Sequence, residues 1–123
     1  MTTAEQDIAA ALVGIDGLDP VAYRPRVIHP GSAWPEWSSA LPLTDCTLNE
    51  TFDVLVVLND TDQNGMAMDR RRLIPLVCDA LRDVGGYIQG SGPVRIALDP
   101  GNPAMGGPSG FRVTIQITTQ EDE

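Results

Sequence analysis

The chain has 123 residues, 42% of them hydrophobic, which is enough for one ordinary domain with a buried core. Its formal net charge is −9, and all eight of its basic residues are arginine. This balance argues against a general nucleic-acid-binding role, because neutralising phosphates requires a basic surface.

The first residues do not follow a secretory signal pattern, and no apolar run reaches the roughly 20 residues of a membrane helix. Cys46 and Cys78 are far apart and form no CxxC pair. We therefore expect a cytosolic setting with two reduced, buried thiols, although the sequence leaves a disulfide open.

A short helix is predicted over residues 3–13. Thr3 can cap it, Gln6 stands at the reciprocal position of a capping box, and Gly14 is a natural stop. The apolar residues that recur at helical spacing are Ile8, Leu12 and Ile15. Because so short a helix is marginal alone, this stripe should dock on the rest of the domain.

Residues 21–29 are typical of a strand, and Pro25 favours an edge position because it removes a ladder donor. The next segment, 30–45, reads "PGSAWPEWSSALPLTD", and its three prolines predict a long, stiff, irregular loop. Trp34 and Trp37 argue against disorder there. They either fold over the sheet as a lid or anchor an interface.

The strongest strand signal covers residues 49–60. Its first apolar face consists of Phe52, Val54, Val56 and Leu58. Leu55 and Val57 make the middle of the second face apolar as well, which predicts burial on both sides. In a monomer this second apolar face would be partly exposed to solvent, so we expect another copy of the chain to cover it.

The stretch "NDTDQNG", 59–65, matches the first half of an EF-hand calcium loop. Position twelve of that loop must supply a bidentate glutamate, and here it is Arg71. We therefore interpret the stretch as a strand-to-helix turn, in which Gly65 relieves the bend and Asn64 or Asp62 caps the helix.

The main helix is predicted over residues 66–84, with a buried stripe of Leu73, Val77, Leu81 and Val84 beside Ile74 and Cys78. Pro75 should kink this helix or mark its first turn, and Gly85 with Gly86 should end it. Its start carries Arg70, Arg71 and Arg72. These either form a solvated helix start or pair with acidic groups on a neighbouring copy.

Strands are predicted at 93–98 and 111–119, separated by a loop over 99–110, and the acidic tail "QEDE", 120–123, is expected to be disordered. The order predicts one α+β domain over 1–123. Its sheet has four mainly antiparallel strands, with two helices packed on one face (α-β-β-α-β-β).

Nothing in the sequence recommends catalysis, so we expect no enzyme, no metal and no cofactor. His29 is the one histidine, and neither a nucleophile elbow nor a phosphate-binding loop is present. The candidate protein-interface residues are Trp34, Trp37, Leu55, Val57, Arg70, Arg71 and Arg72. We expect Trp34→Ala or charge reversal at Arg71 to weaken assembly more than folding.

Six segments together resemble a known family: "TAEQDIAAAL", "VAYRPRV", "PGSAWPEW", "TFDVLVVL", "VCDALRDVG" and "FRVTIQITT". The chain resembles the small tail terminator proteins of long-tailed (siphovirus-type) bacteriophages, especially those infecting actinobacteria. The resemblance covers most of the chain, and "GSAWPEW" is its most specific part. It supplies no catalytic motif, and it transfers no interface residue by position.

The resemblance implies a structural protein of the virion, assembled in the host cytoplasm and placed at the head-proximal end of the tail. Such proteins form a ring, usually of six copies, that stops polymerisation of the tail tube and joins it to the head-completion, or stopper, proteins. The expected partners are the chain itself, the major tail tube protein and the stopper protein. DNA passes the channel without sequence-specific binding, and no membrane is involved. Two alternatives stay open: another head–tail adaptor, such as a head-closure or tail-completion protein, and a monomeric ligand-binding module or enzyme.

Overall fold

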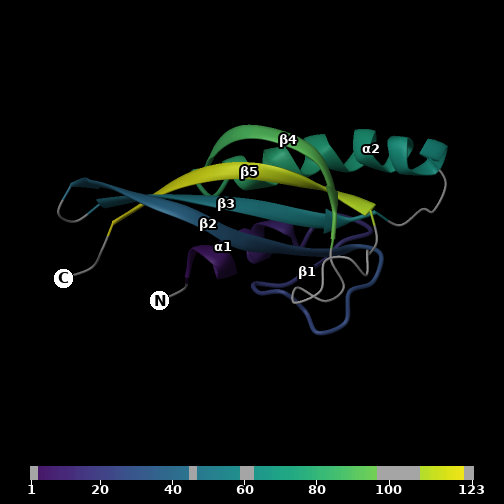
Figure 1. Cartoon of the computed structure of the whole chain (residues 1–123), viewed down its shortest axis with the longest axis horizontal. Helices are drawn as coiled ribbons and strands as arrows, with labels where there is room; N and C mark the ends of the chain where they lie inside the picture. The colour runs from purple at the N-terminus through teal and green to yellow at the C-terminus, as the bar shows by residue number, and fades with distance from the viewer. Residues whose placement is uncertain (1–2, 45–46, 59–62, 97–108, 121–123) are drawn as a thin grey trace.

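The computed structural model describes residues 3–44, 47–58, 63–96 and 109–120. Two helices and five strands make an α+β fold with a mixed, mostly antiparallel open sheet (Figure 1). Along the chain they are α1 (Ala4–Leu12), β1 (Asp19–Pro20), β2 (Ser32–Thr44), β3 (Thr47–Val57), α2 (Gln63–Arg82), β4 (Tyr87–Arg95) and β5 (Ser109–Gln120). The predicted fold class is confirmed.

The strand order is β1-β2-β3-β5-β4, and every neighbouring pair is antiparallel except β1–β2. Four strands were predicted. Three of them correspond to β3, β4 and β5, the one over 21–29 is absent, and β1 and β2 were not predicted as strands. The strands β2 and β3 follow one another in the chain, are 13 and 11 residues long, and form a hairpin.

Both helices pack on one face of the sheet, as predicted, and a single core joins them to it. The core side chains come from α1, from α2 and from alternate positions of the central strands: Ile8, Leu12, Leu73, Val77, Leu81, Phe52, Val54, Val56, Leu58, Phe111, Val113, Ile115 and Ile117. The alternation in β3 and β5 and the helical spacing in α1 and α2 therefore place the same face of each element inside.

The predicted capping box of α1 is present. The Thr3 hydroxyl accepts a hydrogen bond from the Gln6 amide at 3.1 Å, and the Gln6 side chain accepts one from the Thr3 amide at 3.0 Å. Two of the donors that a helix start leaves unpaired are thereby satisfied. The helix ends at Leu12, just before the predicted stop at Gly14.

The prediction of an irregular loop over 30–45 was wrong, because residues 32–44 form the long strand β2. The Val21 amide donates to the Ala33 carbonyl at 2.9 Å, so Ala33 turns its backbone away from β3 toward the outer edge. Pro35, two residues on, turns the same way. Beyond β1, no strand of the described residues lies beside this edge, so a missing donor is tolerated there.

A bulge between Trp37 and Ser39 shifts the register of β2 by one residue. The shift brings Pro42 opposite Leu48, in the same phase as the pair Pro35 and Val54. Both prolines therefore place their ring nitrogens at the open edge of the sheet. Proline in a sequence usually argues against a strand, because it cannot donate a backbone hydrogen bond to the sheet. At the edge that donor has no partner strand, so its loss costs little.

The prediction of an edge strand over 21–29 was also wrong, since these residues form no strand. They form an irregular segment, the strap, which lies over the sheet face opposite the helices and packs Val21 and Ile28 against it. Gly31 closes the strap with φ of +90°, and a Cβ there would come within 2.5 Å of the Gly17 carbonyl oxygen. This crossing admits glycine only.

The helix α2 begins at Gln63, three residues before its predicted start, so Asn64 and Gly65 belong to its first turn rather than to a cap. Asp60 and Asp62 lie outside the described residues. Pro75 sits inside the helix and not in its first turn. Gly85, at φ of +79°, follows the helix end as predicted.

The third predicted strand, 93–98, is displaced toward the N-terminus, because β4 covers Tyr87–Arg95. Its glycine-rich first half reads as a loop in sequence, yet it pairs with β5 from Tyr87 onward. The last strand agrees with its prediction and begins two residues earlier, at Ser109. The predicted loop over 99–110 and the tail over 120–123 fall mostly outside the described residues.

Candidate assembly surfaces

Trp34 lies on the sheet face opposite the helices, in a second small core. It is fully buried there, together with Leu55, Val57 and Ile96, and the strap residues Val21 and Ile28 pack against the group. The prediction that Trp34 sits in a surface loop is therefore corrected. Its side chain is a lid over the sheet, which was one of the two roles considered.

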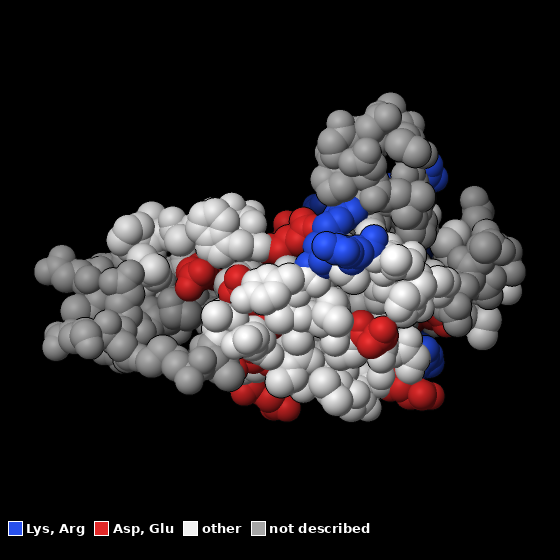
Figure 2. Space-filling model, turned by 90° about the horizontal axis from the view of Figure 1, so that it is seen from below, with Lys and Arg blue, Asp and Glu red and all other residues white. Residues whose placement is uncertain are grey.

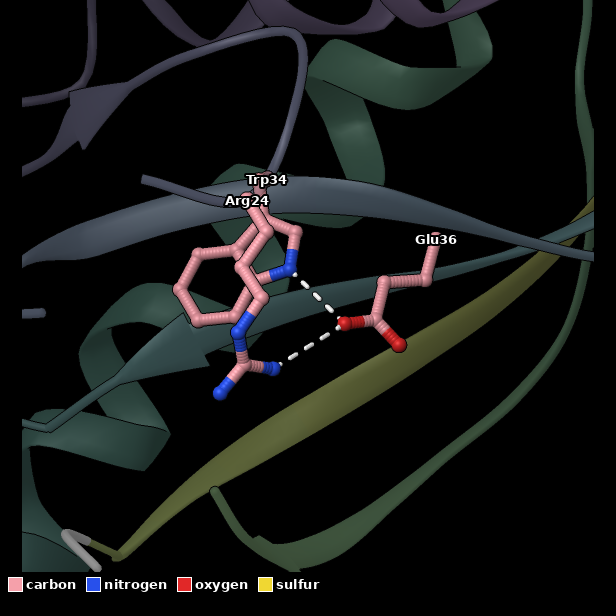
Figure 3. A network of polar contacts seen from close by, with 3 residues as sticks. All are labelled: Arg24, Trp34 and Glu36. Carbon is pink, nitrogen blue, oxygen red and sulfur yellow. Dashed lines mark hydrogen bonds and ion pairs between the residues drawn. The ribbon is translucent and has the colours of Figure 1, made fainter. Parts of the chain in front are cut away.

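A polar network fixes the indole of Trp34 from outside (Figure 3). The Trp34 Nε1–H donates to Glu36 Oε1 at 3.0 Å, and Arg24 Nη1 lies 3.4 Å from the same oxygen. The Arg24 guanidinium also stands over the indole, 5.5 Å from the ring centre. A cation–π contact and a shared carboxylate thus hold the strap on the sheet.

Leu55 and Val57 are 7% and 1% exposed. Burial on both faces of β3 was predicted correctly, but the reason for expecting a second copy over this strip was wrong. The strap and Trp34 cover it within the same chain. These two residues and Trp34 are therefore unavailable to a partner while the strap is in place.

The far end of the sheet is an open surface. Figure 1 shows β2, β3 and β5 running on past the ends of both helices, on the side where the C-terminus lies. We call this end the arm and define it as Trp37–Thr44 of β2, Thr47–Thr51 of β3 and Gln116–Gln120 of β5. From Trp37 to Pro42 the β2 residues of the arm are all exposed.

The arm presents an apolar side chain on each face. Trp37 is opposite Phe52, a residue of the helix-side core, so the 56% exposed indole stands on the helix side of the arm. Leu41, 62% exposed, is opposite Asn49 and so stands on the other face. The bulge in β2 causes this difference, since residues four apart in an unbroken strand share a face.

A carboxylate lies beside the exposed indole. The Trp37 Nε1–H donates to Glu50 Oε2 at 3.0 Å. The sequence contains no arginine from residue 27 to residue 69 or after residue 112, so the whole arm is free of positive charge. The three residues that follow Gln120 in the sequence are acidic as well. The arm therefore combines apolar surface with negative charge.

The three arginines that were predicted to lie at an interface differ in their contacts within the chain. Arg72 Nη1 donates to the Asp16 carbonyl at 3.2 Å and ties α2 to the segment after α1. Arg70 and Arg71 are exposed, and neither forms an ion pair with any residue that the structure describes. Charge reversal at Arg71 stays a prediction about assembly.

A hollow of about 300 Å³ lies beside Arg70. Its lining is largely apolar and includes two arginines: Leu58, Met66, Arg70, Pro93, Val94, Arg95, Ser109 and Gly110. We call it the arginine hollow. The sequence did not point to Arg95, because the strand pattern around it gives no sign that β4 ends beside the start of α2.

Two other candidates have local structural roles. His29 Nε2 lies 3.2 Å from Asp19 Oδ2 and so joins the strap to β1. Burial raises the pKa of the half-buried Cys78 thiol, with Arg82 opposing and Asp79 reinforcing that shift, so the unreactive thiol predominates at neutral pH. Cys46 lies outside the described residues.

Across the described ranges, no group of three or more histidine, cysteine, aspartate or glutamate side chains gathers in a metal-binding arrangement. Neither α1 nor α2 is long and apolar enough to cross a membrane. Figure 2 shows arginine side chains next to acidic ones on one part of the surface, with broad uncharged areas around them. The net negative charge is thus unevenly distributed.

No family model matches the chain, and neither curated proteins nor solved structures show a significant similarity to it.

Proposed function

We propose that the chain is a structural subunit of a phage virion, a tail terminator that forms a ring at the head-proximal end of the tail tube. The observation that carries this proposal is the arm. It extends beyond the domain's own core and leaves Trp37 and Leu41 exposed on opposite faces. Rigid, exposed aromatic anchors of this kind are typical of protein interfaces.

The arm supports assembly in general, and the sequence resemblance supplies the specific role. A terminator contacts its own copies, the tube below and the head-completion proteins above, and so needs several surfaces on a small domain. The strap covers the second core, whereas the arm and the arginine hollow are open and could serve such contacts.

The charge of the chain fits a channel protein that does not hold DNA. A net charge of −9 repels phosphates at any surface that lacks clustered arginine. DNA can then slide through a ring of such subunits without being bound.

The proposal is tested by polymerising the tail tube protein of the same phage with and without this chain, and by measuring tube lengths by negative-stain electron microscopy. We expect tubes of limited length that carry a ring at one end when the chain is present. The Arg26→Glu variant, altered on the exposed strap, serves as a control and should behave like the wild type. Tubes that outgrow their normal length in the presence of the chain would rule the function out.

A further inference from the structure

The arm and the arginine hollow lie at opposite ends of the sheet. The arm contains the start of β3 and the end of β5, whereas the hollow contains Leu58, just after β3, and Ser109, at the start of β5. Eight residues of extended chain separate Glu50 from Leu58, which corresponds to roughly 25 Å. The arm of one chain therefore cannot reach the hollow of the same chain.

The two surfaces are complementary in chemistry. The arm offers an indole with a carboxylate 3.0 Å from its nitrogen, from Trp37 and Glu50. The hollow has a largely apolar lining that includes Arg70 and Arg95. An apolar lining can take up an aromatic ring, and an arginine side chain can pair with a carboxylate in a bidentate arrangement.

We propose that the arginine hollow receives Trp37 and Glu50 from the arm of a second copy of this chain. This inference deepens the proposed function, because it names the contact that joins neighbouring subunits of the ring. The contact is head to tail: each copy gives its arm to one neighbour and its hollow to the other. Such contacts generate closed rings when the rotation between copies closes, and open filaments when it does not.

The charge arrangement gives the contact a direction. The arm carries no arginine, so two arms repel one another. Both charged residues among the described lining of the hollow are arginines, so two hollows repel one another as well. Pairing of like ends is thereby disfavoured, and arm-to-hollow pairing is favoured. The same charges predict that association weakens as salt is added.

The test uses two charge-reversal variants of the full chain, Arg70→Glu in the hollow and Glu50→Arg in the arm, studied by sedimentation velocity over a concentration series at low salt. We expect the wild type to associate in a concentration-dependent manner. Each variant alone should associate at least about tenfold more weakly. An equimolar mixture should regain association, because a reversed arm fits a reversed hollow and the two unaltered surfaces also fit each other.

Arg26→Glu is the matched control, since it makes the same charge change on an exposed residue outside both surfaces. It should leave association unchanged. A wild type that stays monomeric, or variants that associate like the control, would overturn the proposed contact. So would a mixture that associates no better than the separate variants.

Thermal unfolding of each variant separates the contact from an effect within the chain. If Arg70 is bound by acidic groups of its own chain, Arg70→Glu will lower the melting temperature without changing association, and the inference is wrong. The proposed function is judged separately by tube length. Tubes capped at normal length by the Arg70→Glu variant would refute this contact and leave the terminator role standing.

Discussion

Trp34 and Trp37 are three positions apart in β2, yet one is fully buried and the other is 56% exposed. Trp34 fills the space between the strap and β3, and its indole N–H is paired with Glu36. Trp37 stands on the arm, where no helix or strap covers it. Trp34 therefore contributes to the stability of the domain, whereas Trp37 is accessible to the partner that we propose.

We expect Trp34→Ala to lower the free energy of unfolding by about 3–5 kcal/mol, because it leaves a cavity at a fully buried position and removes the cation–π contact with Arg24. Trp37→Ala should change that free energy by less than about 1 kcal/mol and should weaken self-association at least about tenfold. Urea denaturation and sedimentation velocity measure the two effects. Comparable losses of stability in both variants would contradict this division.

The helix α2 carries its proline at an exposed position well inside the helix. Pro75 lacks the N–H that would bond the Arg71 carbonyl one turn earlier, and its ring crowds that carbonyl. The buried stripe of Leu73, Val77 and Leu81 holds the helix on the sheet despite this defect. Packing therefore outweighs local propensity in this element.

Replacing Pro75 with alanine should stabilise the protein by about 1–3 kcal/mol, since the helix regains one hydrogen bond and a favourable residue. The expected rise in melting temperature is several degrees, followed by circular dichroism in the far ultraviolet. Leu76→Ala, at the neighbouring exposed position, is the control and should give little or no rise. A melting temperature lowered by Pro75→Ala would indicate that the proline is needed where it stands.

In the whole molecule, one sheet carries a core on each face. The larger core joins both helices to the sheet, and the smaller one holds the strap through Trp34. Alternate residues of β3 contribute to both cores, so neither face can lose its packing without disturbing the strand that they share. The two faces should therefore unfold together.

We expect a single cooperative unfolding transition. In a Trp37→Phe variant, the fluorescence of Trp34 reports the strap face, and far-ultraviolet circular dichroism reports the helix face. The two signals should give the same midpoint within error. A strap transition at clearly lower denaturant than the helix transition would mean that the outer core opens independently.

The sequence by itself determined which side chains face the core and how charge is distributed along the chain. The capping box of α1, the inward faces of β3 and β5, and the buried stripe of α2 follow from repeats of 2 and 3.6 residues, which depend only on local backbone geometry. The α+β class follows from the order of those elements. The lack of arginine in the arm is likewise a property of the chain alone.

Only the tertiary structure decided that β2 can contain prolines and which of its side chains are buried or exposed. Pro35 and Pro42 are compatible with a strand because that strand lies at an open edge, and an edge is defined by what does not pair with it. Trp34 is buried because the strap covers it, and the bulge after Trp37 places Leu41 on the other face of the arm. Arg70 and Arg95 line the same hollow because β4 ends beside the start of α2. Each of these outcomes depends on contacts between distant parts of the chain, which no local pattern encodes.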